Sequence, residues 1–345
     1  MARMTAAQAR ALCVGILKAS GAPEGEAKLV ADLLVRANLM GVDSHGIVRI
    51  PEYMVDIDGG KLKPGAQVRT MRESAATALV DGGWNFGQVA AMRAMELAGQ
   101  KAQEHDIGMV GVVNCNHVGR LADYVMAAAE RGMIGMMVVK TSSLVAPYGG
   151  TKRILGPNPL GIAVPVEGDR PFVLDMATSA SAAGKVMVRK LRGERLPEGW
   201  IVDPQGRPST DPNDLFAGGS LLPFGGYKGY GLCVAVDLLG GALTGVGCGT
   251  GMGGGYGAFA CGVLAIAIKP DCFVPREQFF GHVRRLVEEL KSSPPQEGME
   301  ILLAGEPEFR EEERRLKEGF DVDETTWGKL MQLAERFKLP KGGAR

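Results

Sequence analysis

The sequence has little of what marks several common protein classes. Its 39 Lys and Arg residues are balanced by 39 Asp and Glu residues, so it lacks the basic excess of proteins that bind nucleic acid or anionic membranes. It has no apolar signal core near the N-terminus and no run of about 18 apolar residues. We therefore expect no nucleic-acid partner, no membrane segment and a cytoplasmic location.

The sequence also lacks closely spaced cysteine pairs and has few histidines. The six cysteines include no CxxC pair, which argues against a zinc site or redox dithiol and predicts reduced thiols without a metal. Four histidines leave few side chains that exchange protons near neutral pH. Glycine, by contrast, is abundant, with 50 residues dispersed among apolar sequence. This pattern indicates tight turns and close backbone approaches, which are typical of a ligand-binding enzyme.

Local patterns predict helices at both chain ends and alternating strands and helices between them. Thr5 and Gln8 have the spacing of a capping box, and Gly41 is placed to end a second helix. The expected strands are 76–80, 108–114, 134–140, 161–166, 172–175 and 257–268. The expected later helices are 88–104, 119–131, 179–190, 228–243, 276–291, 307–318 and 323–337. We predict an α/β (α+β) fold with a helical domain from 1–70 and 275–345 and a mixed-sheet domain from 71–274.

A glycine motif near residue 250 matches a dinucleotide-binding fingerprint but lies in the wrong context. Gly249, Gly251 and Gly254 satisfy GxGxxG. The fingerprint needs a strand before it and a helix after it. Here a helix-like segment precedes the glycines and a strand-like segment follows. We therefore interpret the motif as a glycine loop, not a phosphate cradle.

The first string of candidate functional residues is GVDSHGIVRIPEYM. If the segment from Gly46 is helical, His45, Arg49 and Tyr53 recur at a spacing of four and share one face. Arginine can bind a carboxylate with two parallel hydrogen bonds, and histidine can give or take a hydroxyl proton. A histidine at a helix start, with a surface salt bridge between Arg49 and Glu52, is the alternative.

The second string is VVNCNHVGRLADY, between an expected strand and an expected helix. Open α/β sheets commonly bind ligands at such strand ends, and Asn114, Asn116 and His117 could point there. A hydrolase or lyase in which Cys115 acts with His117 is an alternative, although a buried inert thiol is the favoured interpretation. We expect His105 and His282 to be surface residues of helices.

Three further polar strings stand out. Asp175 ends a strand, and Thr178 and Ser179 are placed to cap a helix of small residues whose amides could meet a phosphate. Lys228 lies among glycines and aromatics at an expected helix start. Asn158, between two prolines, predicts a rigid polar corner before a strand.

Together these strings resemble the type-2 malate/L-lactate dehydrogenase family of NAD(P)-dependent oxidoreductases. The resemblance covers nearly the whole chain. It rests on ANLMGVDSHGIVRIPEYM (37–54), NCNHVGR (114–120), APYGG (146–150), GPNPLGIAVP (156–165), LDMATSASAAGK (174–185), GGYKGYGL (225–232) and LAGEPE (303–308). The chain departs from the usual family pattern at Val118, at GPNP (156–159) and at Ala304.

The resemblance implies a homodimer and a non-Rossmann, largely antiparallel or mixed sheet domain that binds NAD or NADP and the substrate. The catalytic residues it implies are Ser44, His45, Arg49, Tyr53 and His117. The dinucleotide contacts it implies are Gly119, Arg120, Leu121, Val173, Leu174, Asp175, Met176, Ala177, Tyr227, Lys228, Gly305 and Glu306.

The chemistry that follows from this resemblance is hydride transfer between the dinucleotide and a malate- or lactate-like 2-hydroxy acid, which becomes the 2-oxo acid. We expect Arg49 to hold the substrate carboxylate and His45 or His117 to exchange the hydroxyl proton. Asp43 or another carboxylate would orient that histidine. Reduction of a cyclic imine or a diketo sugar acid, oxidation of ureidoglycolate, and a non-catalytic dinucleotide sensor are the alternatives.

Overall fold

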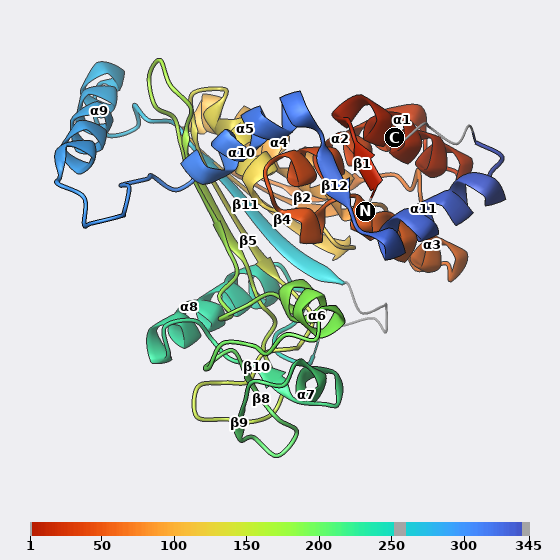
Figure 1. Ribbon diagram of the computed structural model, residues 1–345. Coiled ribbons are helices and arrows are strands. Elements are labelled where there is room, and N and C mark those ends of the chain that lie inside the picture. The colour runs from red at the N-terminus through yellow and green to blue at the C-terminus, as the bar shows by residue number, and fades with distance from the viewer. Residues whose placement is uncertain (1, 252–259, 340–345) are drawn as a thin grey trace.

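The computed structural model describes residues 2–251 and 260–339, and these form a mixed α/β protein (Figure 1). The helices are α1 (Ala6–Ala19), α2 (Glu24–Leu39), α3 (Ile50–Asp58), α4 (Gly87–His105), α5 (Ala122–Ala129), α6 (Ala183–Leu191), α7 (Pro212–Phe216), α8 (Tyr227–Asp237), α9 (Arg276–Ser292), α10 (Glu306–Glu318) and α11 (Glu324–Arg336). The strands are β1 (Ala2–Met4), β2 (Arg69–Glu73), β3 (Thr77–Asp81), β4 (Ile107–Cys115), β5 (Ile134–Lys140), β6 (Leu160–Val164), β7 (Phe172–Met176), β8 (Ile201–Val202), β9 (Pro208–Ser209), β10 (Ser220–Leu221), β11 (Cys261–Ile268) and β12 (Phe320–Val322).

The centre of the described chain is a seven-stranded sheet with the order β2-β3-β4-β11-β5-β6-β7. Five of its six neighbouring pairs are antiparallel, and β3 and β4 form the parallel pair. The predicted mixed, largely antiparallel sheet is therefore confirmed.

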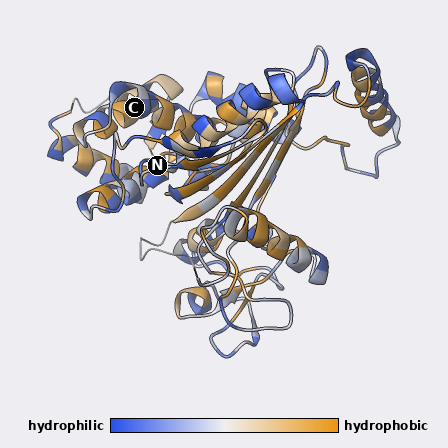
Figure 2. Cartoon of the chain, turned by 180° about the vertical axis from the view of Figure 1, so that it is seen from behind, coloured by the Kyte–Doolittle hydropathy of each residue, from blue (hydrophilic) through white to orange (hydrophobic). Residues whose placement is uncertain are grey.

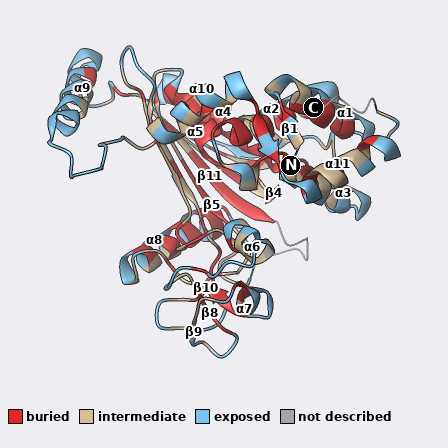
Figure 3. Ribbon diagram, viewed as in Figure 1, coloured by how far each residue is buried: buried red, intermediate tan, exposed pale blue. Residues whose placement is uncertain are grey.

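Strand β11 lies in the middle of this sheet and is buried along nearly its whole length (Figure 3). Helices α4 and α5 cover one face of the sheet, and α8 packs against β5. A strand that is covered on both faces has a continuous apolar sequence, here CGVLAIAI, instead of alternating apolar and polar residues. Figure 2 shows the same apolar band along the central strands.

The two ends of the chain pack together. Strands β1 and β12 pair antiparallel, with Ala2 opposite Val322, and helices α1, α2 and α11 share one apolar core. Helix α9 falls within the predicted helical domain but stands apart from these helices at the other end of the sheet (Figure 1). The domain boundaries at residues 70 and 275 stay a prediction.

A smaller lobe lies below the sheet in Figure 1. It contains α6, α7, α8 and a three-stranded sheet of order β10-β8-β9, around a separate apolar cluster that includes Val186, Leu215 and Cys233. Sequence patterns did not predict this small sheet, because two-residue strands are too short to show alternation.

Most expected elements are confirmed within a few residues, and the capping box of Thr5 and Gln8 is formed. The predicted start of the helix at 179 is wrong: α6 begins at Ala183, and Thr178 and Ser179 bond loop carbonyls instead of capping it. The first residues of the predicted strand 257–268, and Gly254 of the glycine motif, lie outside the described residues.

All six cysteines are free thiols. Within residues 2–251 and 260–339, no helix has the length and hydropathy needed to cross a membrane.

Candidate active site

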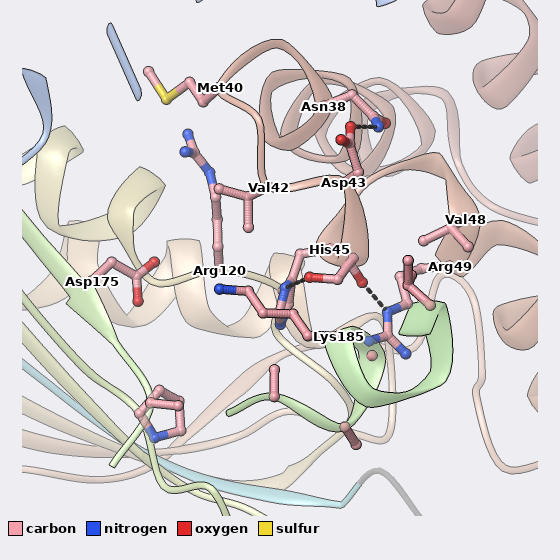
Figure 4. Close-up of a pocket in the computed structure, with 18 of the residues that line it drawn as sticks. Asn38, Met40, Val42, Asp43, His45, Val48, Arg49, Arg120, Asp175 and Lys185 are labelled. Atoms are coloured by element: carbon pink, nitrogen blue, oxygen red, sulfur yellow. Dashed lines mark hydrogen bonds between the residues drawn. The ribbon is translucent and has the colours of Figure 1, made fainter. Parts of the chain in front are cut away.

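A cavity of about 1770 Å³ brings together segments that lie far apart in the sequence. Its walls come from the loop after α2, the loop after β4, strand β7, helix α6 and the start of α10. His45, Arg49, Arg120, Asp175 and Lys185 all line it (Figure 4).

The segment after Gly46 is helical, as the spacing argument assumed, but the argument also needed His45 to continue that helix, and it does not. Two 3₁₀ turns, η1 (Asp43–His45) and η2 (Ile47–Arg49), are separated by an extended Gly46 and followed by α3. Asn38 holds this break: its Oδ1 accepts from Ile47 N at 2.9 Å and would lie 2.1 Å from a Cβ at Gly46. The spacing-of-four argument is therefore wrong for these residues.

The predicted catalytic residues nevertheless meet in space. The rings of His45 and His117 stack with centroids 5.6 Å apart and an interplanar angle of 22°. The Tyr53 hydroxyl is 2.9 Å from His117 Nδ1, and Ser44 Oγ is 3.0 Å from His45 Nδ1. Tertiary contacts, and not a shared helix face, assemble the site.

A hydroxyl, and not a carboxylate, contacts Nδ1 of each imidazole. Asp43 instead accepts from Asn38 Nδ2 at 2.7 Å and from Arg315 Nη1 at 2.7 Å. The expectation that Asp43 orients a histidine is therefore wrong, because Arg315 from α10 neutralises that carboxylate.

Arg49 forms the alternative salt bridge with Glu52 and also lines the cavity, as a residue that binds substrate would. Its Nη1 donates to Glu52 Oε2 at 2.6 Å, which is the expected salt bridge, and its Nε donates to Ser44 O at 2.7 Å. The arginine side chain is only 16% exposed and lines the cavity. The ion pair thus fixes a cavity arginine instead of a surface one.

Burial and positive charge lower the pKa of both histidines. Burial lowers the pKa of His45 to about 3, with further contributions from the charges of Arg49, Arg120 and Lys185. Burial, Arg49 and His45 hold the pKa of His117 well below its ordinary value. Both rings are therefore neutral at neutral pH in the free protein and can accept a proton.

The structure brings most, but not all, of the predicted dinucleotide contacts to this cavity. Those that line it are Gly119, Arg120, Leu121, Val173, Leu174, Asp175, Met176, Ala177 and Gly305. Tyr227 and Lys228 are exposed at the start of α8, and Glu306 accepts from Lys291 Nζ; these three are not among the residues that line it.

Two carboxylates, the buried Asp123 and the half-buried Asp175, lie beside this part of the cavity. Arg120 donates to both oxygens of Asp123 at 2.7 Å, and Asp175 Oδ2 accepts from Ala122 N at 2.8 Å. Burial raises the pKa of Asp175 to about 6. Asp175 can therefore accept a hydrogen bond from a ligand hydroxyl.

Lys185 is a cavity residue that sequence reasoning missed. It is the third residue of α6 and ends the string LDMATSASAAGK, where attention fell on the small capping residues. Its charge lowers the pKa of His45. The sequence feature that could have identified Lys185 is a lysine that follows a glycine at an expected helix start.

The alternative based on Cys115 is not supported by the geometry. This thiol is buried, donates to Asn116 O at 3.3 Å and is not among the residues that line the cavity. Burial raises the pKa of Cys115 well above its ordinary value, which disfavours the thiolate that nucleophilic attack requires. His105 and His282 lie exposed on α4 and α9, as expected.

Known proteins resemble the chain along nearly its whole length. It is 40% identical over 332 residues to L-sulfolactate dehydrogenase of Methanocaldococcus jannaschii, covering 95% of each chain. It is 39% identical over 340 residues to malate dehydrogenase of Pyrococcus abyssi, covering 94% of this chain and 91% of the relative. The solved sulfolactate dehydrogenase from M. jannaschii covers 98% of both chains with a TM-score of 0.90 and 38% identity.

The fold and these matches define an oxidoreductase of the hydroxy-acid dehydrogenase class. Residues 4–331 match the malate/L-lactate dehydrogenase family, and the chain belongs to that family. Membership implies a nicotinamide dinucleotide cofactor and a small hydroxy- or oxo-acid substrate.

Proposed function

We propose that this protein interconverts a 2-hydroxy acid and its 2-oxo acid with NAD or NADP in the cavity described above. The observation that carries the proposal is the stacked pair of neutral histidines beside Arg49 on one cavity wall. The pair offers proton acceptors, and the guanidinium offers a partner for the substrate carboxylate.

The cavity residues fit a dinucleotide. A volume of about 1770 Å³ exceeds the 300–1,000 Å³ of an ordinary small-molecule site, so it can hold a dinucleotide together with a small acid. Gly305, with φ +98, precedes the thirteen-residue α10, and Val173 N donates to Ala304 O at 3.0 Å. A Cβ at Gly305 would lie 3.1 Å from that of Val173, so glycine keeps this helix start close to β7. The amides of a helix N-terminus suit a phosphate, and Asp175 suits a ribose hydroxyl.

The chain's own residues supply binding and proton transfer. Arg49, held by Glu52 and the Ser44 carbonyl, binds the substrate carboxylate, which places the hydroxyl carbon beside the histidines. During oxidation the hydroxyl proton moves to the histidine pair, and during reduction the protonated pair returns it. When bound, the nicotinamide supplies hydride acceptance or donation at the same carbon.

The substrate that we propose carries a second anionic group. Three cations affect His45: Arg49, which is paired with Glu52 and in this proposal binds the first carboxylate, Arg120, which is paired with Asp123, and Lys185. Within residues 2–251 and 260–339, Lys185 forms no ion pair. Its charge is therefore available for a second carboxylate or a sulfonate, as in malate or sulfolactate.

We also propose that two copies of the chain form a homodimer through α9. Phe280 is the one buried residue of this seventeen-residue helix, and Leu286 and Leu290 are 57% and 43% exposed. An amphipathic helix that stands apart from its own chain can bury these leucines against a second copy (Figure 1).

The test of the proposed activity is the absorbance of the reduced nicotinamide during incubation with 2-oxo acids. Purified protein is mixed with NADH or NADPH and with pyruvate, oxaloacetate, phenylpyruvate or a cyclic imine. We expect oxidation of the cofactor when oxaloacetate is present. The dinucleotide that is oxidised at the higher rate, NADH or NADPH, identifies the coenzyme. Folded protein that binds the dinucleotide but oxidises it with no oxo acid would contradict the proposal and favour a sensor.

A further inference from the structure

The Tyr53 hydroxyl lies between the side chains of Gln88 and His117. Gln88 Nε2 donates to Tyr53 Oη at 2.7 Å, and Tyr53 Oη is 2.9 Å from His117 Nδ1. The three residues come from the start of α4, from α3 and from the loop after β4. Gln88 and Tyr53 are 1% and 4% exposed. They form a buried chain of hydrogen bonds that ends on an imidazole of the site.

Close packing fixes the position of Gln88. A Cβ on the preceding Gly87 would lie 2.1 Å from Asn116 O and 2.4 Å from His117 O. Glycine is therefore required where α4 begins, because the start of this helix packs directly against the backbone of Asn116 and His117. The amide of Gln88 is thereby held beside Tyr53, through which it contacts the imidazole.

The direction of these hydrogen bonds determines the tautomer of His117. A phenol has one hydrogen, so a Tyr53 oxygen that accepts from Gln88 Nε2 must donate its own hydrogen to His117 Nδ1. A ring nitrogen that accepts carries no proton, and the neutral imidazole then has its proton on Nε2.

The other end of the same amide has no partner. Gln88 Oε1 is buried and forms no hydrogen bond with the residues that the structure describes. Leaving a buried polar atom unpaired destabilises the folded protein, because the atom loses its hydrogen bonds to water, so the unpaired oxygen needs a reason. A half-turn of the amide brings Oε1 to Tyr53; the phenol then donates to Gln88, and His117 donates from Nδ1 to the phenol.

We propose that Gln88 is a positioning residue that sets, through Tyr53, which ring nitrogen of His117 carries the proton. With Nε2 of Gln88 facing Tyr53, His117 presents Nε2–H as a donor. With Oε1 facing Tyr53, His117 presents an unprotonated Nε2, the form that accepts a proton from a hydroxyl. The amide turn thus exchanges the donor and acceptor forms of one histidine without moving the ring.

For the reaction, this inference rests on the proposed function. A hydroxyl proton that moves to Nε2 leaves an imidazolium whose Nδ1–H donates to Tyr53, while the phenol donates to Gln88 Oε1. Among the described residues, the groups that face His117 include Tyr53 from α3, His45 from η1 and Arg49 from η2. Arg49 opposes the imidazolium, so an accepting Gln88 oxygen at the end of the chain offsets part of that repulsion.

The direct test is nuclear magnetic resonance of full-length protein labelled with ¹⁵N-histidine, because Nδ1 and Nε2 shifts report the tautomer without any turnover. His117→Asn assigns the signal. In the unsubstituted protein we expect the Nε2–H form. In Gln88→Glu, an ionised carboxylate can only accept, so we expect His117 to convert to the Nδ1–H form. In Gln88→Met, which has neither donor nor acceptor, we expect a mixture. An unchanged tautomer in both variants, each shown to be folded, would overturn the inference.

Kinetics supply the second readout. We expect Gln88→Met to lower kcat about 10- to 100-fold with KM within about twofold, as part of the 10²–10⁴-fold typical of acid–base catalysis. We expect Gln88→Glu to recover part of the rate and to raise the acidic pKa of the pH profile. The matched control is Asn158→Ser, which removes a buried amide bonded to Asp237 and should lower stability without changing the tautomer. A normal kcat and pH profile in Gln88→Met would contradict the proposal. If the unsubstituted protein and all variants show no turnover but the tautomer changes as expected, only the dehydrogenase activity is contradicted.

Discussion

The two histidines of the candidate site come from separate parts of the sequence, and their rings stack on one another in the structure. His45 and His117 are 72 positions apart in the chain, yet their ring centroids are 5.6 Å apart. Burial and the nearby cations keep both rings neutral. Proton acceptance and substrate binding are therefore assigned to different residues, which single substitutions can separate.

We expect His45→Ala and His117→Ala each to lower kcat by about 10²–10⁴-fold, since a positioned proton carrier contributes about that factor. Arg49→Ala should raise KM with a smaller effect on kcat, because it removes the partner of the substrate carboxylate. Steady-state kinetics with the panel's best substrate measure both effects. His105→Ala, on the surface of α4, is the control, and ordinary turnover in both site-histidine variants would refute the site.

Lys185→Met should raise KM for oxaloacetate about tenfold and leave KM for pyruvate within about twofold. The reason is that only the dianion places a second charge beside this lysine, and one unscreened ion pair of about 1.4 kcal/mol corresponds to that factor. Lys190→Met is the matched control, because Lys190 lies on the same helix but, unlike its ring partner Phe216, is not among the residues that line the cavity. Equal changes for both oxo acids would argue against a second anionic group.

The lowered pKa of His45 predicts a loss of stability in acid. The folded protein binds a proton at His45 only near pH 3, whereas the unfolded chain binds it near pH 6.5, so the unfolded state holds more protons between these values. The free energy of unfolding should therefore fall as pH drops from about 6.5, by up to about 1.4 kcal/mol per pH unit for this group. Urea unfolding of the protein and of His45→Asn at pH 7, 6 and 5 measures the difference. Parallel curves would contradict the prediction.

At the scale of elements, the break between η1 and η2 decides whether Ser44 and His45 face the cavity. Gly46 has extended backbone there, and Asn38 occupies the space of its missing Cβ. A helical register through this segment would change the directions of the flanking side chains. The break is thus a requirement of the site as well as of the packing.

We expect Gly46→Ala to destabilise the protein by about 1–3 kcal/mol, because the added carbon must displace the Asn38 amide. Activity should fall as well, since Asn38 positions the Ile47 amide beside His45. Urea unfolding and initial rates measure the two effects. Gly25→Ala in α2 is the control: no heavy atom within 4 Å meets its Cβ, so it should be neutral or stabilising. Similar stability in both variants would show that the break tolerates a side chain.

At the scale of the whole molecule, the chain ends and the sheet enclose the cavity together. Residues of α10, β12 and α11 line it beside residues from the first fifty positions and from the sheet. Helix α9 extends from this assembly (Figure 1), and its Leu286 and Leu290 are exposed. The two ends of the chain therefore line one cavity, and we propose that α9 contacts a second copy.

Replacing Leu286 and Leu290 by lysine should convert a dimer into a monomer, because two charges would be buried in an apolar contact. Size-exclusion chromatography with light scattering gives the mass of each form. Val55→Lys, an exposed apolar position on α3, is the control and should leave the mass unchanged. A monomeric unsubstituted protein, or a dimeric double variant, would contradict the role of α9.

The sequence by itself determined the elements that bury a continuous or periodic apolar pattern, such as β5, β11, α4 and α11, and the polar strings that hold His45, Arg49 and His117. Only the tertiary structure decided the pairing of β1 with β12, the exposed strand β2, the break at Gly46, the partner of Asp43 and the positions of Lys185 and Gln88 at the site. The physical reason is that a local pattern reports which face of an element is buried, whereas a hydrogen bond or ion pair depends on a partner whose distance along the chain no local pattern encodes. Gln88 illustrates the difference, since its helical position was predictable but its contact with Tyr53 joins residues 35 positions apart.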